Sequence, residues 1–152
     1  GLRVLRELRH PYVDDDLLWP PIEPIVIELA DSGQTADVIR WAISCLGYKA
    51  ESPQALHAVL RRTDHPDWTV RFAVAAALPS LTDDSKPDQQ VVDALLTLAE
   101  DTEANVRSYA IMGLAGDLGL ASTIASTLRT HVTDPDEQIR NYCRQALDET
   151  QA

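Results

Sequence analysis

A short pattern of apolar and charged positions, which we call the repeated phrase, recurs along the chain at helical spacing. A β-branched residue is followed by Arg at +1, by small or apolar residues at +4 and +7, and by Leu at +8. Three full copies begin at Val70, Val106 and Ile139. Apolar residues at these offsets lie on one face of an α-helix, so each copy predicts an amphipathic helix.

A looser fourth copy precedes these three. It begins at Val38 and keeps Ala42, Cys45 and Leu46, but its arginine, Arg40, stands one place later than in the other copies. The +8 leucines of the four copies are separated by 32, 36 and 33 residues. A period of this length is typical of stacked supersecondary units that act by presenting an extended surface.

A second amphipathic helix is expected before each copy, with an acidic turn between the two. Leu56, Val59 and Leu60 show the apolar spacing of such a helix, and Ser52-Pro53 is a favourable helix start. The segment 10–20 is the least regular, and the prolines at its end favour a helix entry near residue 21. The expected helices are 2–8, 21–31, 37–47, 53–63, 67–81, 88–100, 104–116, 121–132 and 136–149.

These helices predict an all-α protein of about four helical hairpins, preceded by a partial N-terminal helix. The length fits a single domain spanning residues 1–152. Its expected units are 1–10 (partial), 12–50, 51–84, 85–118 and 119–150.

The repeated phrase resembles the units of the HEAT-repeat family, in particular the short HEAT-like repeats of phycobilisome lyases. The resemblance rests on residues 134–147, 70–81 and 101–114, and it covers about residues 21–150. It implies a right-handed α–α superhelix of the HEAT or armadillo type. It also implies that the second helix of each hairpin lines the concave face.

The resemblance further implies a ladder of turn aspartates and helix arginines between neighbouring units. By position, the ladder residues are Arg71, Asp101, Arg107, Asp134 and Arg140. The implied pairs are Asp101 with Arg107 and Asp134 with Arg140. His65 stands where the preceding unit would carry its aspartate, so Asp64 or Asp67 is the expected partner of Arg71.

Composition makes the chain acidic, with a formal net charge of −11. Such a chain repels a phosphate backbone, so we expect no nucleic-acid partner. Residues 82–103 are strongly acidic and form either a solvated edge or a docking site for a basic partner. No apolar run is long enough to span a bilayer, and the two cysteines fall in distant units. We therefore expect a cytoplasmic protein that contacts no membrane.

No catalytic or metal-binding motif stands out in the chain. The four histidines are scattered, and neither a His-x-x-x-His pair nor a Cys-x-x-Cys motif is present. A nucleophile elbow and a phosphate-binding glycine loop are also missing from the sequence. We therefore expect no metal, no cofactor and no enzymatic activity.

Aromatic residues accompany the helix arginines in a chain that is only 5% aromatic. Rings with a polar tip are favoured binding anchors, and packing between units is an equally open interpretation. The neighbouring +5 and +6 positions are small or apolar in the middle of the chain, which suits a partner helix or loop. The candidate binding residues are Trp41, Phe72, Tyr109, Met112, Tyr142 and Arg144.

The function expected from these observations is a non-catalytic scaffold that binds a protein on the concave face, and the acidic charge of the chain favours a basic partner. Neutralisation of a toxin is one version of that role. The alternatives are an enzyme of the HEAT-like DNA glycosylase type and a chaperone subunit like the phycobilisome lyases. The protein is expected to be a monomer or a weak homodimer.

Overall fold

The computed structural model describes residues 15–50 and 52–150, and within these ranges it is all-helical with no strand. Eight α-helices follow one another, and a short 3₁₀ turn (η1) and a π turn (η2) extend two of them. The elements are α2 (Asp15–Ser32), α3 (Ala36–Lys49), α4 (Pro53–Leu60), α5 (Trp68–Ala77), η1 (Leu78–Leu81), α6 (Gln89–Ala99), α7 (Ala104–Met112), η2 (Gly113–Asp117), α8 (Ala125–His131) and α9 (Glu137–Glu149). The all-α class is therefore confirmed, whereas the expected helix at 2–8 lies outside the described residues.

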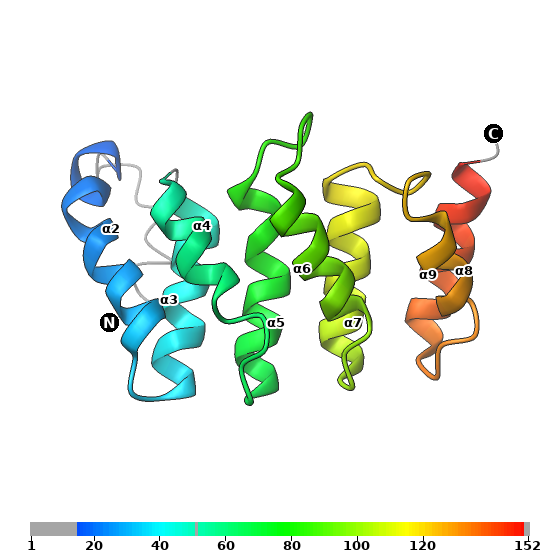
Figure 1. Ribbon diagram of the computed structural model, residues 1–152, viewed down its shortest axis with the longest axis horizontal. Helices are drawn as coiled ribbons and strands as arrows, with labels where there is room; N and C mark the ends of the chain where they lie inside the picture. Colours follow the sequence, from blue (N-terminus) through cyan, green and yellow to red (C-terminus); the bar gives the residue numbers. More distant parts are fainter. Residues whose placement is uncertain (1–14, 51, 151–152) are drawn as a thin grey trace.

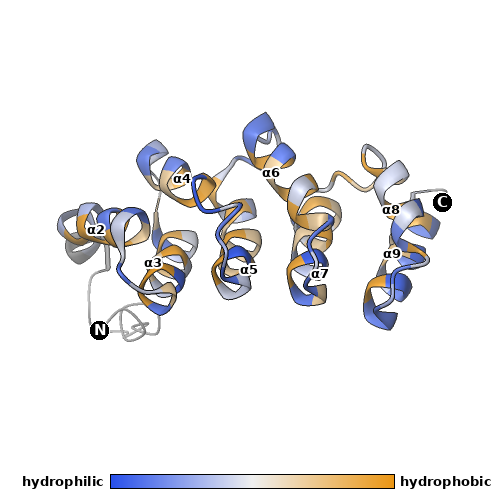
Figure 2. Cartoon of the chain, turned by 60° about the horizontal axis from the view of Figure 1, so that its bottom comes forward, coloured by the Kyte–Doolittle hydropathy of each residue, from blue (hydrophilic) through white to orange (hydrophobic). Residues whose placement is uncertain are grey.

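The helices form a row of antiparallel pairs, with α2 at one end and α9 at the other (Figure 1). Seen from a second direction, α4, α6 and α8 lie in one layer and α3, α5, α7 and α9 lie in the other (Figure 2). In this second layer, each helix contacts the next one along the row. A continuous face is therefore built from helices that carry the repeated phrase.

The repeated phrase forms the core between the layers. Val70 and Val106 are 0% exposed and Ile139 is 2% exposed. The +4 residues of all four copies are fully buried, as are the +8 leucines of the first three copies. The +5 position, which we expected on the open face, is also buried on α5 and α7, where Ala75 and Ile111 stand. Of the +5 and +6 positions on these two helices, only the +6 residues, Ala76 and Met112, are exposed.

Side-chain caps define where most of these helices begin. Ser52 accepts a hydrogen bond from the backbone N–H of Ala55 and is followed by Pro53, which confirms the predicted start of α4. Asp67 and Asp136 cap α5 and α9 in the same manner. The acidic turns therefore satisfy backbone donors that the first helical turn leaves unpaired.

The first helix begins earlier than expected. We placed its start near residue 21, but α2 begins at Asp15 and runs through Pro20, Pro21 and Pro24. Proline removes a backbone donor and disfavours a helix interior. Here Trp19 packs against the core together with residues further along α2, so burial extends the helix across the prolines.

Two helices of the second layer end earlier than expected, and their irregular ends meet. Helix α5 gives way to the 3₁₀ turn at Leu78, and α7 gives way to the π turn at Gly113. A Cβ on Gly113 would lie 2.8 Å from Cγ of Pro79. The two turns pack so closely that only a glycine fits at this point.

A second close approach joins α3 and α5, the most closely packed pair of neighbours in this layer. A Cβ on Gly47 would lie 2.7 Å from Cβ of Ala77. Small residues on both helices therefore set the distance between α3 and α5.

Candidate functional site

Two arginines join consecutive units through bidentate ion pairs. Nε and Nη2 of Arg71 donate to the carboxylate of Asp101 at 2.6 and 2.9 Å. Nε and Nη2 of Arg107 donate to Asp134 at 2.9 and 2.8 Å. Each carboxylate belongs to the turn of the following unit, so each pair fixes one second-layer helix relative to the next.

The pairing within each unit differs from our expectation. Nη1 of Arg107 donates to the backbone carbonyl of Asp101 at 2.8 Å, and Nη1 of Arg140 donates to the carbonyl of Asp134 at 2.7 Å. The implied side-chain pairs are therefore wrong, because both arginines bind the carbonyl of their own turn, and Arg107 binds the carboxylate of the following turn. Arg71 follows the same rule and does not use Asp64 or Asp67.

Arg140 ends this series. Its Nη1 is bonded to the carbonyls of Asp134 and Pro135, at 2.7 and 2.8 Å. Within residues 15–50 and 52–150, no carboxylate pairs with its Nε and Nη2.

The ladder changes the acidity of its carboxylates. The pKa of Asp134 is lowered to about 2, first because Arg107 donates to the carboxylate, although burial opposes this shift. Burial would raise the pKa of Asp101, but hydrogen bonds from Arg71 and from the backbone N–H of Glu103 lower it. His131, which is buried, lies 3.2 Å from both Asp134 and Glu100 and links α6 to the last turn.

No such arginine–aspartate ion pair links α3 to the turn before α5 among the residues described. Nδ1 of His65 accepts the backbone N–H of Asp67 at 3.1 Å, as Asp101 and Asp134 accept the N–H groups two residues after them. His65 thus keeps the turn but offers no carboxylate to a preceding arginine. Arg40 instead donates to Asp37 on its own helix at 2.8 Å.

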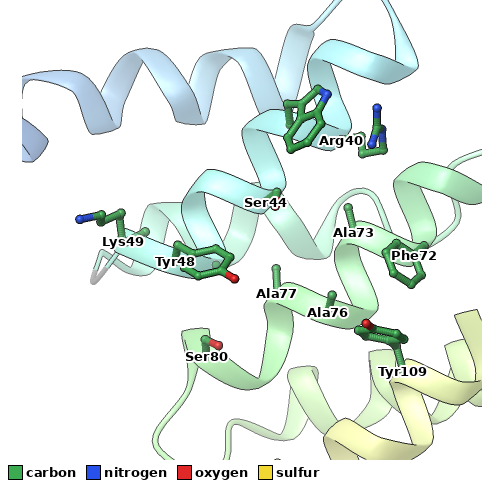
Figure 3. A pocket seen from close by; sticks show the side chains of 13 residues that line it. Arg40, Ser44, Tyr48, Lys49, Phe72, Ala73, Ala76, Ala77, Ser80 and Tyr109 are labelled. Atoms are coloured by element: carbon green, nitrogen blue, oxygen red, sulfur yellow. The ribbon is translucent and has the colours of Figure 1, made fainter. Parts of the chain in front are cut away.

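A groove of about 710 Å³ lies at this step, between α3 and α5. Figure 3 shows Ala73, Ala76 and Ala77 as a strip along α5, with Tyr48 on one side and Phe72 and Tyr109 on the other. Arg40 and Lys49 both belong to α3, Arg40 near Ala73 and Lys49 beyond Tyr48 (Figure 3). The other lining residues are Trp41, Ser44, Gly47, Ala50 and Ser80.

The rings of the groove are held by contacts with one another and with Arg40. The centroids of Phe72 and Tyr109 lie 4.6 Å apart in an edge-to-face arrangement. The guanidinium of Arg40 lies over Trp41, 4.7 Å from the ring centroid. Tyr48 and Tyr109 remain exposed by 56% and 46%, so both rings can contact a ligand.

The structure brings together three of the six candidate binding residues. Trp41, Phe72 and Tyr109 line the groove. Met112 is 44% exposed and lies one helical turn beyond Tyr109, outside the lining.

The other two candidates lie near the far end of the row. The hydroxyl of Tyr142 lies 3.1 Å from where a Cβ on Gly116 would stand, and burial raises its pKa. Arg144 is exposed on α9 and donates to the carbonyl of Val132 at 3.2 Å. Neither residue reaches the groove.

Several lining residues that sequence reasoning missed continue the spacing of Trp41. On α3, Trp41, Ser44 and Tyr48 stand at +3, +6 and +10 of the phrase, and on α5 and the following η1 the same offsets give Ala73, Ala76 and Ser80. Residues at these offsets lie along one face of a helix. Extending the stripe from +3 to +10 would have found Tyr48 and Ser80.

Comparison with protein-family models, with curated proteins and with solved structures finds no match to this chain. In the part of the chain that the structure describes, no three His, Cys, Asp or Glu side chains gather as a metal site would require. No described helix is both long and apolar enough to cross a membrane.

Proposed function

We propose that this protein is a non-catalytic protein-binding module, built as a HEAT-type solenoid, whose groove between α3 and α5 receives a segment of another protein. The recurring phrase and the row of helix pairs support the solenoid. The observation that carries the function is the groove itself, where four aromatic residues surround a strip of small side chains.

The chemistry of the lining favours a peptide segment. Exposed tyrosines supply apolar area together with a hydroxyl, which is why such residues are enriched among binding anchors. The alanine strip leaves room for an apolar side chain of the partner. Ser44 and Ser80 stand beside it and offer hydroxyl groups to polar atoms of the incoming chain.

The same lining supports binding over catalysis. Among the described residues that line the groove there is no His, Cys, Asp or Glu. These side chains are the ones that most often act as general acids, general bases and covalent nucleophiles. Both cysteines are buried elsewhere, and burial raises the pKa of Cys143 to about 11, which keeps its thiol protonated.

Selection from a library of random peptides tests this proposal. Ala76 is exposed in the groove floor, so Ala76→Trp fills the groove without entering the core. Ser126→Trp places the same ring on an exposed position of α8 and serves as the matched control. We expect peptides that bind the unmodified protein and the control but not Ala76→Trp.

Two results would contradict the proposed function. One is a selection in which no peptide is enriched on the unmodified protein. The other is a set of enriched peptides that binds the Ala76→Trp variant equally well.

A further inference from the structure

We infer that the segment bound in the groove is acidic, with an apolar side chain over the alanine strip and carboxylates directed at Arg40 and Lys49. This inference rests on the proposed function and specifies the chemistry of its partner. It differs from our expectation of a basic partner, which rested on the charge of the whole chain.

The charged residues that line the groove are basic, although the molecule as a whole is acidic. The chain carries 24 acidic residues and 13 lysines and arginines. The charged side chains that line the groove are nevertheless Arg40 and Lys49, with no carboxylate among the lining residues described. Basic side chains lining a groove of an acidic protein are complementary to an anionic partner.

Arg40 departs in two ways from the arginine–aspartate pairs of the other units, and both leave it lining the groove. It stands at +2 of the phrase, so it is turned about 100° around the helix from the +1 arginines. The carboxylate that would hold it in the next turn is replaced by His65. Departures from an otherwise regular pattern are expected where function competes with regularity.

Arg40 also keeps hydrogen-bonding capacity. Its Nε is buried and has no hydrogen-bond partner among the described residues, although buried donors are usually paired. Its Nη2 donates to Asp37, whose side chain is 80% exposed, and such surface pairs contribute little. Hydrogen bonds from Thr69 lower the pKa of the Asp67 carboxyl, and the nearby charge of Arg40 adds to this shift. A partner carboxylate would therefore compete at the guanidinium with the exposed pair to Asp37.

The other occupants suggested by such a groove are a nucleic acid and a second copy of the chain. A phosphate backbone would face a molecule of net charge −11, whose acids lie outside the groove. A peptide extends over a shorter distance and needs only the local cations, because salt at about 0.15 M screens charges beyond roughly 8 Å.

The experiment measures how tightly peptides selected for the groove bind to variants in which Arg40 and Lys49 are changed. Arg40→Gln/Lys49→Gln removes the positive charges, and Arg40→Glu/Lys49→Glu reverses them. Lys86→Glu/Arg129→Glu changes the net charge as much as the second variant does, at exposed positions outside the lining. Circular dichroism establishes that each variant is folded before binding is measured near physiological salt.

We expect peptides that depend on an open groove to be enriched in Asp and Glu. Their affinity should fall by about tenfold in the Gln variant, as for loss of hydrogen bonds to charged groups, and further in the Glu variant. The Lys86→Glu/Arg129→Glu control should bind within about twofold of the unmodified protein.

Groove-dependent peptides of neutral or basic composition would overturn the inference and leave the proposed function standing. Failure to obtain any groove-dependent peptide would overturn both. Tight binding of oligo(dT) that requires Arg40 and Lys49 would show that these cations bind a phosphate backbone. That result would overturn the inference of an acidic peptide. Self-association abolished by Ala76→Trp would make a second copy the occupant and would also overturn it.

Discussion

At the scale of single residues, the described part of this protein depends on arginines that each bind two different acceptors. Nη1 of Arg71 and of Arg107 closes the turn of its own unit, while Nε and Nη2 bind the next carboxylate. A lysine has no planar fork and cannot make both sets of bonds in this geometry. The arginines therefore act as spacers that set each helix against its neighbour.

Removal of Arg107 should be far more harmful than removal of Arg140. Arg107→Ala leaves Asp134, which is 6% exposed, buried without its cation, and we expect a loss of about 3 kcal/mol in the free energy of unfolding. Arg140→Ala removes bonds to two carbonyls only, so its loss should be about 1 kcal/mol. Urea unfolding of the two variants measures the difference, and equal losses would show that the ion pair contributes nothing beyond the turn.

Asp134 also predicts how stability depends on acid. The folded protein lowers the pKa of this carboxyl from its ordinary value of 3.8 to about 2, first through the hydrogen bond from Arg107. A lowered pKa means that the unfolded chain binds the proton more tightly. The resulting stability, about 2 kcal/mol, is complete above about pH 4 and is lost as the pH falls toward 2.

The matched variant for this acid dependence is Asp134→Asn, which keeps the shape of the side chain without its charge. Between pH 4.5 and 2.5, its free energy of unfolding should fall less steeply than that of the unmodified protein. Parallel curves would show that other carboxylates account for the acid sensitivity.

At the scale of helices, the offsets 0, +4, +7 and +8 were enough to predict the second-layer helices and the face that each one buries. Periodicity did not reveal which acceptor each guanidinium would take, because Asp101 is adjacent in space to both Arg71 and Arg107. It also misplaced the start of α2, because burial of Trp19 outweighs the prolines. The groove was only partly predicted, since Trp41, Phe72 and Tyr109 were recognised and the +10 residues Tyr48 and Ser80 were not.

The spacing of α3 and α5 gives a prediction about the element that shapes the groove. Gly47→Ala places a Cβ 2.7 Å from Cβ of Ala77, so the two helices must separate. Overpacking of this kind costs about 1–3 kcal/mol. Ala77→Gly in the same chain removes the obstructing atom and should recover part of the loss.

A double-mutant cycle in thermal or urea unfolding measures this coupling between Gly47 and Ala77. Additive losses would mean that the helices adjust without contact at this point. Peptide binding by Gly47→Ala should also weaken, because both residues line the groove.

At the scale of the whole molecule, contacts run mainly between elements that are close along the row. Helix α3 packs extensively on both α2 and α5, whereas α9 packs on α8 and touches α7 more sparsely. Arg107, which donates to Asp134, and His131, which lies 3.2 Å from Glu100, add polar contacts between the last hairpin and the unit before it. Molecules whose units contact only their neighbours can open from one end.

The two cysteines report this opening directly, because one lies near each end of the described row. Cys45 on α3 and Cys143 on α9 are 1% and 0% exposed, so neither thiol should react with iodoacetamide in the native state. In urea below the unfolding midpoint, we expect Cys143 to be alkylated before Cys45, since α9 has fewer contacts to break. Peptide mapping by mass spectrometry separates the two rates. In Arg107→Ala the rate at Cys143 should rise further while that at Cys45 stays nearly unchanged. Equal rates at both cysteines in every variant would mean that the described helices unfold as one cooperative unit, in spite of their arrangement in a row.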